Sequence, residues 1–141
     1  MLKKVLLINT VIFILFYGGC GNDDDANTID PKTAQLNALA GLWQVNGVIN
    51  DNIDVSDQFT SFTLQITENR YTTQNGGNPW SEQGTFDIKS DDINILTRDD
   101  DVELKIDELN EGTLVLSFNY SVPPGGRRSG ITGQFTFSLV R

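Results

Sequence analysis

Few residues of this 141-residue chain are suited to acid–base or nucleophilic chemistry. It has no histidine, the side chain that most often serves as general base and metal ligand. The 19 acidic residues mostly alternate with apolar residues or lie in turns, so the pattern places no carboxylate pair in a pocket. We therefore expect no catalytic residues, no metal site, no cofactor and no enzymatic activity. The net charge of −9 also argues against a nucleic-acid partner.

The one thiol, Cys20, is explained by the residues before it. Lys3-Lys4 is a short basic start, residues 5–17 are mainly apolar, and Gly18-Gly19 precede the cysteine. This order predicts a secretory signal over residues 1–19. The apolar run is shorter than the roughly 20 residues of a transmembrane helix. A lone cysteine in a secreted chain cannot form an internal disulfide and needs another role.

Gly18-Gly19-Cys20 resembles the end of a bacterial lipobox, where a peptidase cuts before a cysteine that then carries lipid. Tyr17 departs from that motif, in which Leu, Val or Ile is usual. The resemblance implies that Cys20 carries acyl chains such as palmitate and anchors the protein to a membrane. More than one chain is needed for stable anchoring.

An acidic run, Asp23-Asp24-Asp25, follows in the predicted tether, residues 20–30. Like charges keep a linker extended and solvated, which is one interpretation. The run also resembles the export signal of surface lipoproteins in Bacteroidetes-type bacteria. That resemblance implies an outer-membrane, lipid-anchored protein exposed at the cell surface, although the choice of leaflet stays open.

The rest of the chain changes from a helical period to a period of two. Asp30-Pro31 predicts a helix start and Gly41 its end. Apolar and polar residues then alternate, which predicts strands with one buried face. No helix of crossover length separates the strands, so antiparallel pairing is expected. The architecture is an eight-stranded up-and-down barrel or, alternatively, a two-sheet β-sandwich, with strands at about 42–49, 61–67, 70–75, 82–89, 92–98, 101–109, 112–121 and 130–140.

The alternation also predicts which side chains line the barrel interior. Eight strands enclose either a filled core or room for one small ligand, and a ligand here would be mostly apolar. The expected lining includes Phe62, Leu64, Phe86, Ile95, Leu104, Phe118, Phe135 and Phe137.

Gly41-Leu42-Trp43 resembles the Gly-x-Trp that opens the first strand of lipocalins, where a basic residue after the last strand packs over the tryptophan. Arg141 is that residue here. In a closed eight-stranded meander the first and last strands are neighbours, so geometry also brings Arg141 to Trp43. The resemblance implies a lipocalin-like domain over residues 31–141.

The longer loops of the meander share the end opposite the helix, and binding residues usually lie on such loops. We expect Trp80, Arg127 and Arg128 on this rim. Trp80 is either a contact residue or a lid on the core, and the arginines either contact an anion or solubilise a hairpin tip. We expect the barrel to bind a small apolar ligand in its interior. The alternative is an interaction module, in which the loop rim of a filled barrel contacts a protein or glycan.

Overall fold

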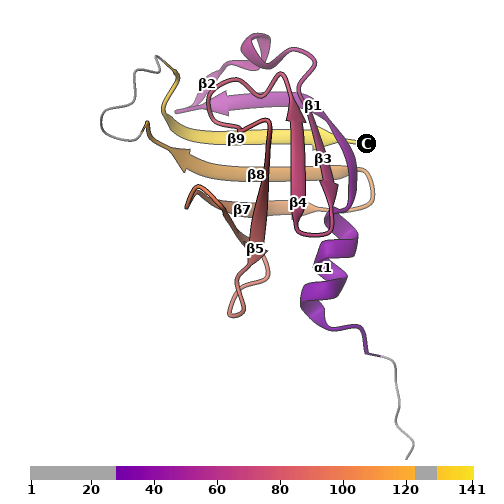
Figure 1. Ribbon diagram of the computed structural model, residues 1–141. Helices are drawn as coiled ribbons and strands as arrows, with labels where there is room; N and C mark the ends of the chain where they lie inside the picture. Colours follow the sequence, from indigo (N-terminus) through magenta and orange to yellow (C-terminus); the bar gives the residue numbers. More distant parts are fainter. Residues whose placement is uncertain (1–27, 123–129) are drawn as a thin grey trace, which may run out of the picture.

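The computed structural model describes residues 28–122 and 130–141 (Figure 1). One helix, α1 (Pro31–Leu39), precedes the strands. Its start follows the predicted chemistry, because Asp30 accepts a hydrogen bond from the backbone N–H of Thr33 at 3.1 Å and Pro31 occupies the first turn. No helix in the described residues has the length and apolar character needed to cross a membrane.

Antiparallel strands make up most of the remaining structure. Each of the eight predicted strands is present, with its bounds shifted by no more than a few residues. The strands are β1 (Gly41–Asn50), β2 (Ile53–Asp54), β3 (Thr63–Thr67), β4 (Arg70–Gln74), β5 (Gln83–Ile88), β6 (Ile95–Arg98), β7 (Glu103–Leu109), β8 (Thr113–Tyr120) and β9 (Gly133–Val140).

Pairing between the first and last strands closes the sheet. From β3 to β9 each strand pairs with the next, β1 pairs with β3 through Gly41–Gln44, and β1 pairs with β9 through Gln44–Asn50. A two-sheet sandwich lacks this continuous ring of pairing. The predicted eight-stranded antiparallel barrel is therefore confirmed, and its closure removes the free edges that an open sheet would expose.

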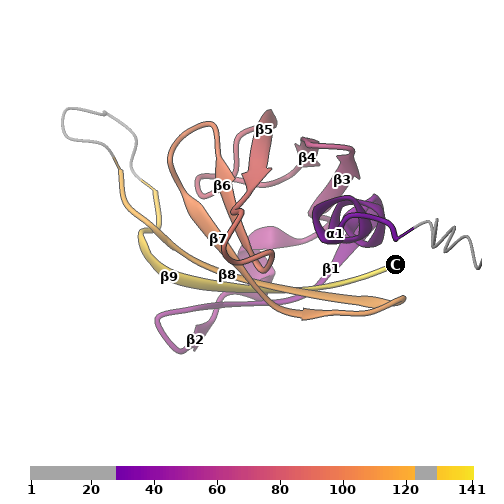
Figure 2. The same cartoon turned by 90° about the horizontal axis from the view of Figure 1, so that it is seen from below.

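The two ends of the barrel are covered differently (Figures 1 and 2). Helix α1 lies at the end that carries the β3–β4 turn, where Gln35 donates a hydrogen bond to the carbonyl of Ile93 at 3.2 Å. The opposite end carries a segment that the alternation does not predict, namely β2 and the short 3-10 helix η1 (Ser56–Phe59). We call this second end the loop-bearing end.

One strand differs from the expected register. The alternation predicts that Ile95 faces inward, but Ile95 is only half-buried and Leu96 is 1% exposed. Asp92 explains the shift, because its backbone and side-chain oxygens accept hydrogen bonds from Ile95 and Asn94 and form a turn where the strand was expected to begin. A slip of one residue exchanges the two faces of a strand, so Arg98 also points inward.

Candidate functional site

Apart from Ile95, the predicted interior side chains do lie inside the barrel, but they fill it. Phe118 stacks on Phe135 and on Phe137, each at 5.7 Å between ring centres. Phe59, from η1, closes the loop-bearing end with its ring 5.0 Å from that of Phe137. Seven of the eight lining residues named above, all except the half-buried Ile95, are 4% exposed or less: Phe62, Leu64, Phe86, Leu104, Phe118, Phe135 and Phe137.

A void of about 10 Å³ remains among apolar side chains below Trp80, too small for an organic ligand. It is lined by Leu64, Ile66, Tyr71, Trp80, Phe86, Leu96, Leu104 and Leu116. In this structure the barrel is a packed core. Room for a ligand inside it would require a side chain to move.

Trp80 is not the exposed rim contact that its loop position suggests. Only 5% of its surface is exposed, and its ring lies 5.4 Å from Phe118 and 5.7 Å from Phe62. Its loop turns the indole inward because burying so large an apolar surface is favourable. Trp80 is therefore a lid on the core, the other interpretation that its position allows.

Arg98 lies under this lid and was not among the predicted site residues. It is 2% exposed, and its Cζ lies 5.1 Å from the centre of the Trp80 ring. Its Nε donates to Asp100 at 3.0 Å and its Nη1 to the carbonyl of Pro79 at 2.8 Å. Arg98 thus ties β6 to the loop that carries Trp80. The signal missed in the sequence is the one-residue register of β6.

Two buried donors beside Arg98 find no hydrogen-bond partner among the described residues, the Oη of Tyr71 and the Nε1 of Trp80. Burial raises the pKa of the Tyr71 phenol, and the positive charge of Arg98 offsets part of that increase. A buried donor without an acceptor costs about 1–3 kcal/mol. The buried polar groups in this part of the barrel therefore have fewer hydrogen-bond partners than those in the rest of the described core.

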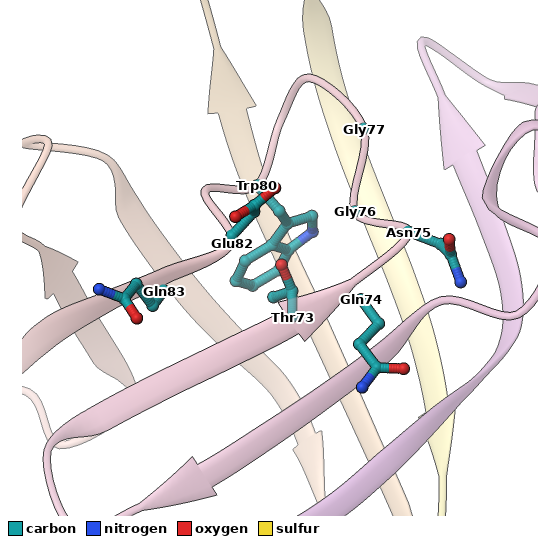
Figure 3. Close-up of a pocket in the computed structure, with 8 residues that line it drawn as sticks. All are labelled: Thr73, Gln74, Asn75, Gly76, Gly77, Trp80, Glu82 and Gln83. Carbon is teal, nitrogen blue, oxygen red and sulfur yellow. The ribbon is translucent and has the colours of Figure 1, made fainter.

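An open cleft of about 660 Å³ adjoins Trp80, where β4 and β5 separate (Figure 3). The two strands stay joined through Thr73, whose N–H donates to the carbonyl of Glu82 and whose Oγ1 donates to that of Ser81. Beyond Thr73 the chain turns through two glycines. The lining residues are Thr73, Gln74, Asn75, Gly76, Gly77, Trp80, Glu82 and Gln83.

The turn beside the cleft is closely packed. A side chain on Gly76 would come within 2.7 Å of Cβ of Trp80, so only glycine fits there without displacement. Asn75 adopts a positive φ of 56° and donates to the carbonyl of Ser61 at 3.0 Å. These contacts set the shape of the cleft and fix it against the lid.

At the other end, Arg141 lies over Trp43, with its Cζ 4.3 Å from the ring centre. Trp43 is fully buried and donates from Nε1 to the carbonyl of Leu39 at 2.8 Å. Arg141 donates to the carbonyl of Ala40 at 2.8 Å, and Gly41 leaves space for its guanidinium. The contact joins the helix, the first strand and the last strand.

Residues 39–116, more than half of the chain, match the family described as a lipocalin-like domain. The chain belongs to this family. The match begins at the end of α1 and includes β1 through the first half of β8. No curated protein matches the chain. A lipocalin-like barrel suggests ligand binding in general, and the family is typically a non-enzymatic binding fold.

The remaining predicted site residues lie outside the described residues. They are Cys20, with the acidic run Asp23–Asp25, and the pair Arg127 and Arg128 in the segment between β8 and β9. Within the described residues, the candidate site therefore consists of the filled barrel, the Trp80 lid and the cleft beside it.

Proposed function

We propose that this chain is a lipid-anchored, non-enzymatic binding protein of the cell surface that contacts its ligand at the loop-bearing end of a filled barrel. The observation that carries the proposal is the contrast between a 10 Å³ internal void and open clefts on the outside of the barrel. One cleft, about 620 Å³, lies between α1 and β3, and the other, about 660 Å³ beside Trp80, lies at the loop-bearing end. Helix α1, which follows the predicted tether, lies at the opposite end (Figure 1). The cleft beside Trp80 would then face away from the membrane.

A second candidate is binding of a small apolar ligand inside the barrel. The void below Trp80 is lined by apolar side chains, and the lid comes from a loop with two glycines. Outward rotation of the indole would join this void to the solvent. A ligand would then have to replace the packing that Trp80 loses.

An apolar fluorescent probe, N-phenyl-1-naphthylamine, separates the two candidates. A filled barrel predicts no fluorescence enhancement with the wild-type protein and clear enhancement with Trp80→Ala, which removes the lid. Native mass spectrometry of protein purified from its own host provides the second measurement. An apolar molecule retained by the wild-type protein would overturn the filled-barrel proposal in favour of the internal site.

The anchor is tested separately with Cys20→Ser in the native host. The proposal predicts that the variant leaves the membrane fraction, because lipid attachment requires the thiol. A variant that stays in the membrane fraction would contradict lipidation at Cys20.

Surface exposure is tested by deleting Asp23–Asp25 and treating intact cells with protease. If the acidic run directs export, the wild-type protein is digested and the deletion variant is protected. Equal digestion of both would leave the run as linker alone.

A further inference from the structure

The side chains that line the cleft beside Trp80 are polar and mostly uncharged. Glu82 is the one acidic residue among them, and none is cationic. Amide and hydroxyl groups both donate and accept hydrogen bonds, so they suit a ligand with many hydroxyl groups. The four that provide such groups are Thr73, Gln74, Asn75 and Gln83.

The lid contributes a donor that the protein itself leaves unused. The Nε1 of Trp80 is buried and has no acceptor among the described residues. Figure 3 shows the indole at the centre of the cleft, with its nitrogen on the side of Gly76. Glycines allow another group to approach the backbone closely. Nε1 has no exposed surface and the space beside Gly76 is filled, so a ligand oxygen would give this donor the acceptor that it lacks only after the indole shifts toward the cleft.

Charge and topology narrow the class of ligand. An anion would meet Glu82 and the net charge of −9, with no cationic side chain in the lining. A peptide commonly docks by adding a strand to a free sheet edge, and closure leaves only short edges of the described strands unpaired, namely the two-residue β2 and the end of β4 at Gln74. A mainly apolar ligand would find little apolar surface apart from Trp80. A neutral, hydroxyl-rich chain fits these conditions best.

We propose that the cleft between β4 and β5 binds a neutral glycan chain, whose hydroxyl groups pair with Gln74 and Gln83 and, once the indole shifts toward the cleft, accept the hydrogen bond from Nε1 of Trp80. This inference rests on the proposed function, since it names the ligand class of the loop-bearing end. Gln74 and Gln83 are exposed and lie at the facing ends of β4 and β5.

Calorimetric titration of the full mature chain with defined oligosaccharides tests the inference. The neutral probes are xylo-, manno-, cello-, malto- and laminari-oligosaccharides, and the anionic probes are hyaluronate and chondroitin sulfate fragments. We expect at least one neutral series to bind and both anionic series to fail. Binding of anionic fragments alone, or of no neutral series, would overturn the inference.

Substitutions then locate the bound glycan. Gln74→Ala combined with Gln83→Ala removes two exposed amides, and we expect at least about a tenfold loss of affinity. The matched control combines Gln44→Ala with Gln134→Ala, two exposed glutamines on β1 and β9, and should bind as the wild type does. Trp80→Phe keeps an aromatic lid without the N–H and should also weaken binding. Equal affinity in all variants would place the glycan elsewhere and overturn the inference.

A peptide library displayed to the same proteins separates this inference from the proposed function. Peptide binding that the Gln74 and Gln83 substitutions abolish would support binding at the loop-bearing end and overturn the glycan assignment. Loss of membrane anchoring in Cys20→Ser is independent of either result.

Discussion

The guanidinium of Arg98 lies over the ring of Trp80, with Cζ 5.1 Å from the ring centre, inside a barrel whose other inward side chains are almost all apolar. The contact joins a strand residue to a loop residue. The charged guanidinium of Arg98 makes two interactions, a cation–π contact with the indole and an ion pair with Asp100. The lid over the core is thus held by a polar group as well as by packing.

Arg98→Met tests whether the contacts of Arg98 stabilise the position of the Trp80 loop. The substitution keeps an apolar side chain of similar length but removes the donors to Asp100 and to the carbonyl of Pro79. We expect the free energy of unfolding to fall by about 2 kcal/mol, since hydrogen bonds of charged groups are worth about 1.5–3 kcal/mol and Asp100 is partly solvated. Urea unfolding measures the change. Arg70→Met, at an exposed position of β4, is the control, and an equal loss there would contradict the role of Arg98.

Tyr71→Phe tests whether the phenol is unsatisfied. Its Oη is buried and has no hydrogen bond of good geometry among the described residues beyond a weak contact with Ser81, so removing it takes away a cost and little bonding. We expect the free energy of unfolding at neutral pH to stay the same or rise by up to about 1 kcal/mol. A loss of stability in urea unfolding would show that the hydroxyl makes a bond in solution.

The same residue predicts a pH dependence of stability. Burial raises the pKa of Tyr71 above its ordinary value of 10.0. Between that value and the folded pKa, the unfolded chain releases a proton that the folded protein keeps, so stability falls as pH rises above about 10. Urea unfolding of the wild type and Tyr71→Phe, on both sides of pH 10, should show a steeper decline in the wild type. Parallel declines would mean that Tyr71 titrates normally.

Gly84→Ala tests the close packing of β5 against Tyr71. A Cβ at Gly84 would lie 2.5 Å from the Oη of Tyr71, and overpacking of this kind costs about 1–3 kcal/mol. Gly112→Ala is the matched control, because nothing lies within 4 Å of a Cβ there. We expect thermal unfolding to show a clear loss for the first variant and a change within about 0.5 kcal/mol for the second. Similar values for both would mean that Tyr71 moves freely.

A double-mutant cycle tests the contact between Trp43 and Arg141. Trp43→Leu and Arg141→Gln, singly and together, should give a coupling energy of about 0.5–1 kcal/mol, because Arg141 is exposed and the cation–π contact is solvated on one side. Denaturant unfolding of the four proteins provides the value. Additive losses would show that the residues stabilise the barrel independently.

The sequence by itself determined the strands, the inward phenylalanines and the meeting of Trp43 with Arg141. In a strand the side-chain direction is fixed by a period of two, so Phe135 and Phe137 had to share a face. Once eight such strands follow each other antiparallel, closure places the last beside the first. These features depend on the alternation of side chains along each strand and on the order of the strands, both of which can be read from the sequence.

Only the tertiary structure decided whether the barrel is hollow. Trp80 and Phe59 come from loops, where no period predicts direction, and both turn inward to complete the core. Arg98 faces inward because a turn at Asp92 shifts the phase of β6 by one residue. Whether the barrel interior is filled depends on side chains that are far apart in the sequence and meet only in the folded protein. The same holds for the cleft that remains where β4 and β5 separate around Trp80.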